Sequence, residues 1–435
     1  MGSNQKRLLG AFAIALAFAT HAQAESQYVI SNISATSDRT SGIALNGSEF
    51  VMSGSGSGSS PFMEAAGYNL STFTQDWTWK NTISAQNFGS AVAVDSLGHV
   101  LVVGSIYFPG TKPTDNFAIA RLYQQSPGVY ALDSSFTSAS CASGYPAGFC
   151  NSKLGSNTNS AAYGAVVDSS NRVVAAGSSG TSTTFNFAIA RYTSSAALDT
   201  SFGGTGFIVT SMPSYPSSNI NALTQDASGN LVAAGSANNG NNACIARYTG
   251  SGAGLDSSLV GGHGAVSPVA GTVCIPNSVL GASSSTVLNG VTVDSAGNIV
   301  VTGTMLPTTG HKVALVARFT STGALDATFG PTGAGFITVQ ATTTLHNVGK
   351  GVQIDPVTNE VVVSGWVGGT AGQKWLIARV SPNGSAVNSA NLFTLPGSGT
   401  QNEATGLIMV PGGALMSGSS DSPTHGKWNF AAALY

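Results

Sequence analysis

The chain has 435 residues, which is enough for two or three ordinary domains or for one long array of repeats. It carries 16 basic and 18 acidic residues and a net charge of −2, so neither a nucleic-acid-binding surface nor an acidic tail is expected. The 55 glycines and the frequent Ser, Thr and Asn residues favour short strands joined by turns and disfavour a helical bundle.

The N-terminus has the pattern of an export signal. A basic start at Lys6 and Arg7 precedes an apolar run, and the sequence AQA at 22–24 fits a signal-peptidase cleavage site. The run is too short to span a bilayer, which takes about 20 residues, and no later segment is long and apolar enough. We therefore expect a signal peptide over 1–24, one domain over 25–435, and a secreted or periplasmic protein that does not span the membrane.

A glycine recurs at the end of an apolar run about every 60 residues. Ahead of it stand stretches such as AVAVDSLGHVLVVG, GAVVDSSNRVVAAG and GVTVDSAGNIVVTG. Each stretch predicts a β-hairpin, because the Asp carboxylate accepts hydrogen bonds from turn N–H groups and the following Gly or Asn tolerates positive φ. The recurring glycines are Gly54, Gly104, Gly177, Gly235, Gly303, Gly365 and Gly418.

A third strand follows each hairpin. The sequence NFAIAR occurs at 116–121 and again at 186–191, and NFAAALY stands at 429–435. An L-D-x-[ST]-F turn comes next, and then a fourth strand such as GFIVT at 206–210. Each repeat is therefore predicted to be a four-stranded antiparallel meander, and such sheets arranged radially form a β-propeller that leaves few exposed edges.

The seventh repeat has no fourth strand of its own. The N-terminal sequence QYVISNISATSDRTSGIAL resembles GFIVTSMPSYPSSNINAL, which holds the fourth-strand position of the third repeat. We therefore expect an all-β fold, a seven-bladed β-propeller of four-stranded antiparallel blades, with its ring closed by the N-terminal strand.

The repeat resembles a known family. The order hairpin, strand and LDTSFG, clearest in LDTSFGGTG at 198–206, is similar to the delta-60 repeat of secreted and surface proteins of bacteria. The resemblance covers nearly the whole mature chain, although the first and seventh repeats are degenerate and the turn rarely has the family's P-D-G-K form. It implies a propeller and an extracytoplasmic setting, and it supplies no shared catalytic motif.

Four cysteines in an exported chain suggest disulfides. Cys141 and Cys150 flank a short Gly/Pro loop, which favours a local bridge, and Cys244 would then pair with Cys274. No C-x-x-C motif indicates zinc. Free buried thiols are the alternative.

An arginine recurs at the end of the third strand. In an up-and-down blade this position lies on the same side as the hairpin turn and the third-to-fourth turn, which both carry Asp. The first and seventh repeats lack this arginine and also lack the hairpin Asp, having Asn46 and Val410 there. We therefore predict structural ion pairs, with a basic binding stripe as the alternative. The arginines are Arg121, Arg191, Arg247, Arg318 and Arg379; the hairpin residues are Asp95, Asp168, Asp226, Asp294 and Asp355; the second turns carry Asp133, Asp199, Asp256 and Asp326.

Ligand binding is then expected on the opposite face, which holds the second-to-third loops and the connections between blades. Exposed aromatic residues there can stack on sugars or peptides. One further position, eight residues before the hairpin turn, is polar in every repeat, and its alternative role is to cap the loops between blades. The expected ligand-binding residues are Trp366, Tyr107, Phe108, Tyr215, Asn87, Asn347 and Asn402.

Catalytic motifs are absent from the sequence, which has no HExxH, no G-x-S-x-G and no carboxylate cluster with metal-like spacing. We expect a monomeric scaffold without metal or cofactor that binds an extracellular glycan or protein, and the sequence leaves open whether the chain is an enzyme. The alternative is a lyase or hydrolase at the channel mouth, similar to streptogramin-lyase-like propellers. Its candidate residues are His311, His346, His425 and Glu403.

Overall fold

Antiparallel strands make up almost all of the regular structure. The only helices in the described part of the chain are α1 (Asn277–Leu280) and the 3-10 helix η1 (Pro331–Gly333), so the all-β class is confirmed. Neither of these two helices has the length and apolar character that crossing a membrane requires. The expected signal peptide lies outside the described residues. The computed structural model describes residues 27–34, 37–57, 60–83, 85–108, 114–156, 159–181, 184–212, 214–369, 371–421 and 427–435.

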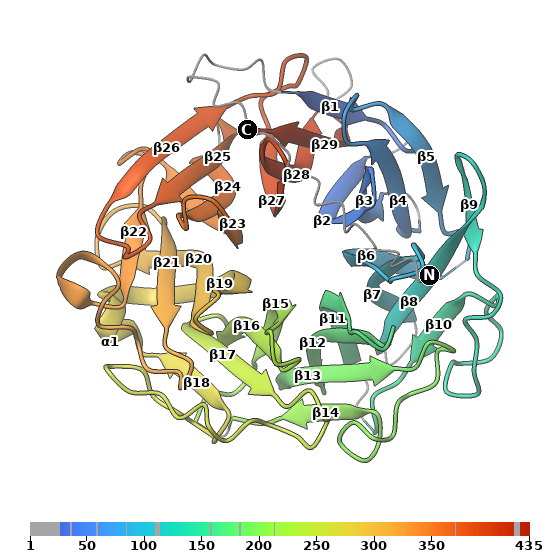
Figure 1. Ribbon diagram of the computed structural model, residues 1–435, viewed down its shortest axis with the longest axis horizontal. Helices are drawn as coiled ribbons and strands as arrows, with labels where there is room; N and C mark the ends of the chain where they lie inside the picture. The colour runs from blue at the N-terminus through green and yellow to red at the C-terminus, as the bar shows by residue number, and fades with distance from the viewer. Residues whose placement is uncertain are drawn as a thin grey trace, which may run out of the picture.

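Successive strands form meanders that lie around a common centre (Figure 1). In each meander the first strand lies nearest the centre, and the following strands lie progressively farther out. The innermost strands are β2 (Asp38–Asn46), β6 (Gln86–Val94), β11 (Asn159–Val167), β15 (Asn219–Gln225), β19 (Ala282–Val293), β23 (His346–Ile354) and β27 (Asn402–Val410).

The second and third strands are buried on both faces, as their runs of Val, Ala and Ile require. Every residue of β12 and of β16 is buried. The second strands are β3 (Glu49–Gly56), β7 (Val100–Phe108), β12 (Val173–Gly180), β16 (Leu231–Ala237), β20 (Ile299–Pro307), β24 (Val361–Gly369) and β28 (Gly413–Asp421). The third strands are β4 (Phe62–Asn69), β8 (Thr114–Ser126), β13 (Phe185–Tyr192), β17 (Asn242–Tyr248), β21 (Val313–Phe319), β25 (Gly372–Val380) and β29 (Trp428–Leu434).

The outer strands complete the meanders. The N-terminal strand β1 pairs antiparallel with β29, with Tyr28 opposite Ala433. The long strand β8 pairs with two outer strands, β9 and β10. The outer strands are β1 (Tyr28–Ser31), β5 (Gln75–Lys80), β9 (Val129–Leu132), β10 (Phe149–Ser152), β14 (Phe207–Thr210), β18 (Thr272–Ile275), β22 (Phe336–Val339) and β26 (Val387–Phe393).

The hydrophobic core consists of layers between neighbouring sheets. In one layer, Val232 and Ile245 from one meander pack with Leu288 and Val301 from the next. All four side chains are at most 1% exposed. Burial of this apolar surface, at about 25 cal/mol per Å², fixes each sheet against its neighbours.

Both expected disulfides are present, and no free cysteine occurs in the described residues. Cys141 pairs with Cys150, which closes the loop before β10. Cys244 pairs with Cys274, and these residues lie directly opposite each other on β17 and β18. Two disulfides are typical of an extracellular or periplasmic protein.

The recurring glycine lies opposite a β-bulge in the innermost strand. In the third meander, Ala162 pairs with Gly177 and Gly164 pairs with Ala176, which leaves Tyr163 as the extra residue. A Cβ on Gly177 would lie 1.9 Å from the carbonyl oxygen of Ala161. At all seven recurring glycines the corresponding distance is between 1.8 and 2.1 Å, so only glycine fits.

Each bulge adds one residue to the innermost strand, which lies nearest the centre of the molecule (Figure 1). These positions carry polar residues or tyrosine. The bulge residues are Ser41, Ser90, Tyr163, Asn221, Asn289, Lys350 and Thr405.

The variant Gly365→Ala tests whether the contact with the innermost strand requires a glycine. The new methyl group would lie 1.9 Å from the carbonyl oxygen of Val348, so the strands must separate locally. We expect a loss of about 1–3 kcal/mol in the free energy of unfolding, measured by urea denaturation.

Gly369→Ala in the same strand is the control, because its nearest neighbour would be Leu345 Cδ2 at 3.6 Å. We expect this variant to unfold close to wild type. Equal stability of the two variants would contradict the steric explanation.

Candidate functional site

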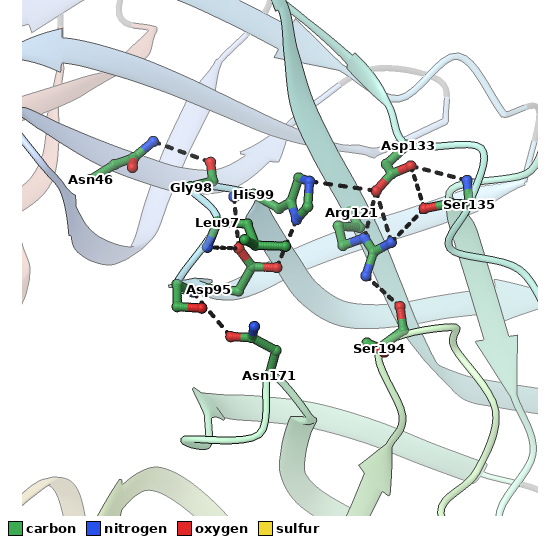
Figure 2. A network of polar contacts seen from close by, with 11 residues as sticks. Asn46, Asp95, Leu97, Gly98, His99, Arg121, Asp133, Ser135, Asn171 and Ser194 are labelled. Atoms are coloured by element: carbon green, nitrogen blue, oxygen red, sulfur yellow. Dashed lines mark hydrogen bonds and ion pairs between the residues drawn. The ribbon is translucent and has the colours of Figure 1, made fainter.

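The recurring arginines join neighbouring meanders on one face of the molecule. Figure 2 shows Arg121 between Asp133, Ser135 and the backbone carbonyl of Ser194, which belongs to the next meander. Arg191, Arg247 and Arg318 repeat this pattern with Gly250, Ser321 and Pro382.

Arg191 illustrates the energetics. Its side chain is 2% exposed, its Nε donates to Asp199 Oδ2 at 2.8 Å, and its Nη1 donates to the carbonyl oxygen of Gly250 at 2.9 Å. Partial burial alone would raise the pKa of Asp199, but hydrogen bonds from Ser201 and the charge of Arg191 lower it. The guanidinium group is therefore a structural cross-link.

The structure distinguishes between the two sets of Asp that the sequence offered as partners of these arginines. Four of them pair with the Asp of the second turn, namely Asp133, Asp199, Asp256 and Asp326. Arg379 alone has the expected hairpin partner, Asp355, and it also contacts Glu360. The other hairpin Asp residues stabilise the turns in which they lie. The carboxylate of each accepts hydrogen bonds from the backbone N–H groups of the residues two and four positions later in the chain. The Asp residues concerned are Asp95, Asp168, Asp226 and Asp294.

We predict that Arg191→Ala lowers the free energy of unfolding by about 1–3 kcal/mol, because the Asp199 carboxylate loses its buried partner and keeps only the more exposed Arg172, whose Nη1 lies 3.2 Å from Asp199 Oδ2. The double variant Arg191→Met with Asp199→Asn removes both charges and should lose less. Urea denaturation measures both. Arg39→Ala is the control, since the Arg39 side chain is 56% exposed and should contribute little. A fully stable Arg191→Ala protein would contradict the structural role.

The repeated polar position does not face a ligand. Asn87, Asn347 and Asn402 are each 0% exposed. Asn87 accepts a hydrogen bond from the Met63 N–H at 2.7 Å, and Asn347 bonds to the backbone of residues 341–345. These side chains cap the connections between meanders, so we correct the expectation that they bind ligand.

The expected aromatic residues are half-buried. Phe108 and Tyr215 pack against apolar cores, and Trp366 lies opposite Val348 and Trp375 in its sheet. Neither these three residues nor Tyr107 lines the cavities of about 570 and 710 Å³ that are described below.

A cavity of about 710 Å³ brings two of the candidate histidines together. His311 lies between β20 and β21, and His346 is the first residue of β23. Their ring centroids are 5.2 Å apart and the rings are inclined at 74°. The backbone N–H of Lys312 donates to His346 Nδ1 at 3.1 Å, so Nε2 carries the proton of the neutral ring.

The charge of this cavity is positive. Lys374, His311 and His346 line it, and its described lining includes no Asp or Glu. Burial, together with the nearby His311 and Lys312, lowers the pKa of His346, which is therefore neutral at neutral pH. The cavity thus combines an uncharged imidazole with a fixed cation.

Two polar groups in the same cavity lack partners within the described part of the chain. Thr342 Oγ1 and Gln373 Oε1 are both buried without a hydrogen-bond partner, and both residues line the cavity. Unsatisfied buried polar groups cost about 1–3 kcal/mol each, a cost that a ligand with hydroxyl groups would remove.

The other two candidates do not join this site. Glu403 does not line the cavity, and its Oε2 lies 3.8 Å from Arg39 Nη1. His425 lies outside the described residues. Sequence reasoning missed Lys374 and Gln373, which lie at the start of β25, because the other repeats have different residues at these two positions of the third strand.

A buried carboxyl group lies away from this cavity. Glu64 on β4 is 0% exposed, as is Asp38 at the start of β2. Burial first, and then the charge of Asp38, raise the pKa of Glu64 to about 9, although Lys80 opposes the shift. Glu64 is therefore protonated at neutral pH.

The pKa of Glu64 predicts a stability that depends on pH. The unfolded state loses its proton near pH 4.5 and the folded state near pH 9, so the stability contributed by Glu64 falls as pH rises between these values. We expect Glu64→Gln to gain stability over wild type as pH rises through this range, measured by thermal unfolding. The exposed variant Asp76→Asn is the control. A pH-independent difference for Glu64→Gln would contradict the prediction.

The comparisons support a propeller. A family model described as a domain of unknown function (DUF5122) beta-propeller matches residues 169–202. Among curated proteins, none matches the sequence.

Solved structures resemble the whole chain. The polysaccharide lyase Uly1 has a TM-score of 0.50 and 10% identity, covering 93% of this chain and 90% of its own. An ulvan lyase from a new polysaccharide lyase family has a TM-score of 0.46 and 10% identity, covering 88% and 92%. Trypanosoma rangeli sialidase has a TM-score of 0.40 and 9% identity, covering 94% and 59%. At these identities the likeness shows the fold.

The expectation of a scaffold without catalysis is wrong on these findings. The similar structure with a TM-score of 0.50, Uly1, is described as a polysaccharide lyase. This finding agrees better with the alternative that the sequence left open, a lyase or hydrolase at the channel mouth.

Proposed function

We propose that the protein is a polysaccharide lyase that cleaves an acidic glycan in the cavity of His311 and His346. The observation that carries this proposal is the convergence of two imidazoles and Lys374 in a cavity whose described lining has no acidic side chain. A cavity of this size and charge fits a carboxylated or sulfated sugar.

The lining favours elimination over hydrolysis. Most glycoside hydrolases use a pair of carboxyl groups that flank the bond to be broken. The described lining of this cavity offers neutral imidazole and ammonium groups instead. These groups suit proton abstraction from the carbon next to a carboxylate.

In the proposed reaction Lys374 pairs with the uronate carboxylate, which makes the neighbouring C5 proton more acidic. His311 takes that proton, the electron pair forms the C4=C5 double bond, and the C4–O bond breaks. The proton on His311 then passes to the leaving oxygen, so one imidazole completes the cycle. His346 stays neutral and donates a hydrogen bond from Nε2.

Thr342 and Gln373 complete the substrate contacts. The buried Gln373 Oε1 accepts a hydrogen bond from a sugar hydroxyl, and Thr342 Oγ1 donates or accepts one. The apolar side chains of Leu345 and Leu392 line the same cavity and provide a surface for a sugar ring.

We also propose the finer architecture on which this site depends. The seven repeats form seven blades of a single domain over 25–435, and β1 closes the ring as the outer strand of the last blade. Support comes from the pairing of β1 with β29 and from the seven glycine–bulge contacts. The repeat is assigned to the delta-60 type.

The proposed setting is outside the cytoplasm. A signal peptide over 1–24 exports the chain, which acts as a monomer on an extracellular polysaccharide. Support comes from the two disulfides and from the N-terminal sequence.

Elimination leaves a double bond conjugated to the carboxylate, which absorbs ultraviolet light. We expect the mature protein to generate this absorbance on at least one uronic-acid polysaccharide from a panel of ulvan, alginate and polygalacturonate. His311→Ala should reduce kcat by about 100-fold or more, and Lys374→Ala should both raise KM and reduce kcat, because the lysine binds the carboxylate and makes the C5 proton more acidic.

Trp366→Ala, outside the cavity, is the matched control and should keep full activity. New reducing ends without the absorbance would indicate hydrolysis and contradict the lyase. Full activity of His311→Ala would contradict the assigned site.

A further inference from the structure

A second cavity, of about 570 Å³, lies against the innermost strands β11, β15 and β19. The bulge residues of these three strands, Tyr163, Asn221 and Asn289, all line it. Tyr163 is 41% exposed although its neighbours in the strand are largely buried. The three bulges therefore turn their side chains toward one common space.

The amide groups of this cavity are held in place. Asn221 Nδ2 donates to the carbonyl oxygen of Leu288, and Asn289 Nδ2 donates to that of Gly349, each at 2.8 Å. A backbone carbonyl can only accept a hydrogen bond, so each amide must present its NH₂ group to the carbonyl. The Oδ1 atoms of Asn221 and Asn289 therefore point away from these two carbonyls. Asn289 Oδ1 is thus positioned as an acceptor before any ligand arrives.

The cavity is nearly uncharged. Asp115 is the one charged side chain of its described lining, and no Lys, Arg or His contributes. Burial raises the pKa of Asp115. Burial and the charge of Asp115 raise the pKa of Tyr163, so the tyrosine keeps its hydroxyl proton and is a donor. An anionic ligand would find no cation here.

We propose that this cavity binds an uncharged sugar. The hydroxyl groups of a sugar match the fixed Asn289 amide and the Tyr163 hydroxyl, and its C–H face packs on the accessible Tyr163 ring. The contrast with the other cavity, which has Lys374 and two imidazoles, makes this a separate site for a neutral unit.

The inference goes beyond the proposed function and does not depend on elimination chemistry. β19 contributes Asn289 to this cavity, and the same meander contributes His311 to the other. One polysaccharide with both neutral and acidic sugars would therefore have subsites on both sides of this meander.

The test is calorimetric titration of the mature protein with neutral tetrasaccharides of glucose, mannose, galactose and xylose. We expect at least one to bind in the millimolar range, with affinity reduced about tenfold or more by Tyr163→Ala. Tyr163→Phe keeps the ring and should lose less. Tyr107→Ala, a half-buried aromatic outside the cavity, is the control, and melting temperatures verify folding.

The proposal would be overturned if no tetrasaccharide binds the wild-type protein, or if binding survives Tyr163→Ala unchanged. Lys374→Ala separates the two sites, because it should impair elimination and leave neutral-sugar binding intact. Loss of neutral-sugar binding in Lys374→Ala would place the sugar in the other cavity and also contradict this inference. Neutral binding by a protein without lyase activity would support the inference and reject only the proposed function.

Discussion

The rest of the structure depends on the close contact between the recurring glycine of the second strand and a backbone carbonyl next to the β-bulge of the innermost strand. In every repeat a Cβ at the glycine would lie at most 2.1 Å from a backbone oxygen of the innermost strand. The contact fixes the register of the first two strands, because moving the glycine by one residue would bring a side chain against the bulge. It also determines which residue of each repeat becomes the extra one beside the channel.

One face of the molecule carries the structural ion pairs, and the other carries the candidate binding site. On one face, arginines such as Arg191 connect the turn between the third and fourth strands of one meander to the backbone of the next meander. Each repeat therefore contains the residues that cross-link it to its neighbour. The histidine cavity lies instead in the loops at the other ends of the strands, where His346 begins β23. Loops that differ between repeats can gain catalytic or binding residues without altering the fold, because the strands that support them form a rigid framework.

Periodic features were predictable from the sequence, and features found only once were not. The hairpins, the third strands and both disulfides follow from local patterns and were found as expected. The sequence left the arginine partners open because both turns place Asp on the same side, and only the geometry separates Asp168 from Asp199. Lys374 and Gln373 lie at the start of the third strand β25, at positions where the other repeats have different residues, so no periodic pattern marks them. The bulge position, five residues before each hairpin turn, could have been found by aligning the repeats.

The central claim is that the cavity of His311 and His346 binds and cleaves an acidic glycan. A crystal structure of the His311→Ala variant with a uronate tetrasaccharide that has no unsaturated end tests this claim most directly. The account predicts that the sugar lies in the His346 cavity, with its carboxylate against Lys374 and its C5 hydrogen facing the space left by the removed imidazole. A tetrasaccharide bound with its carboxylate away from Lys374, or bound only outside this cavity, would contradict the assignment of the site.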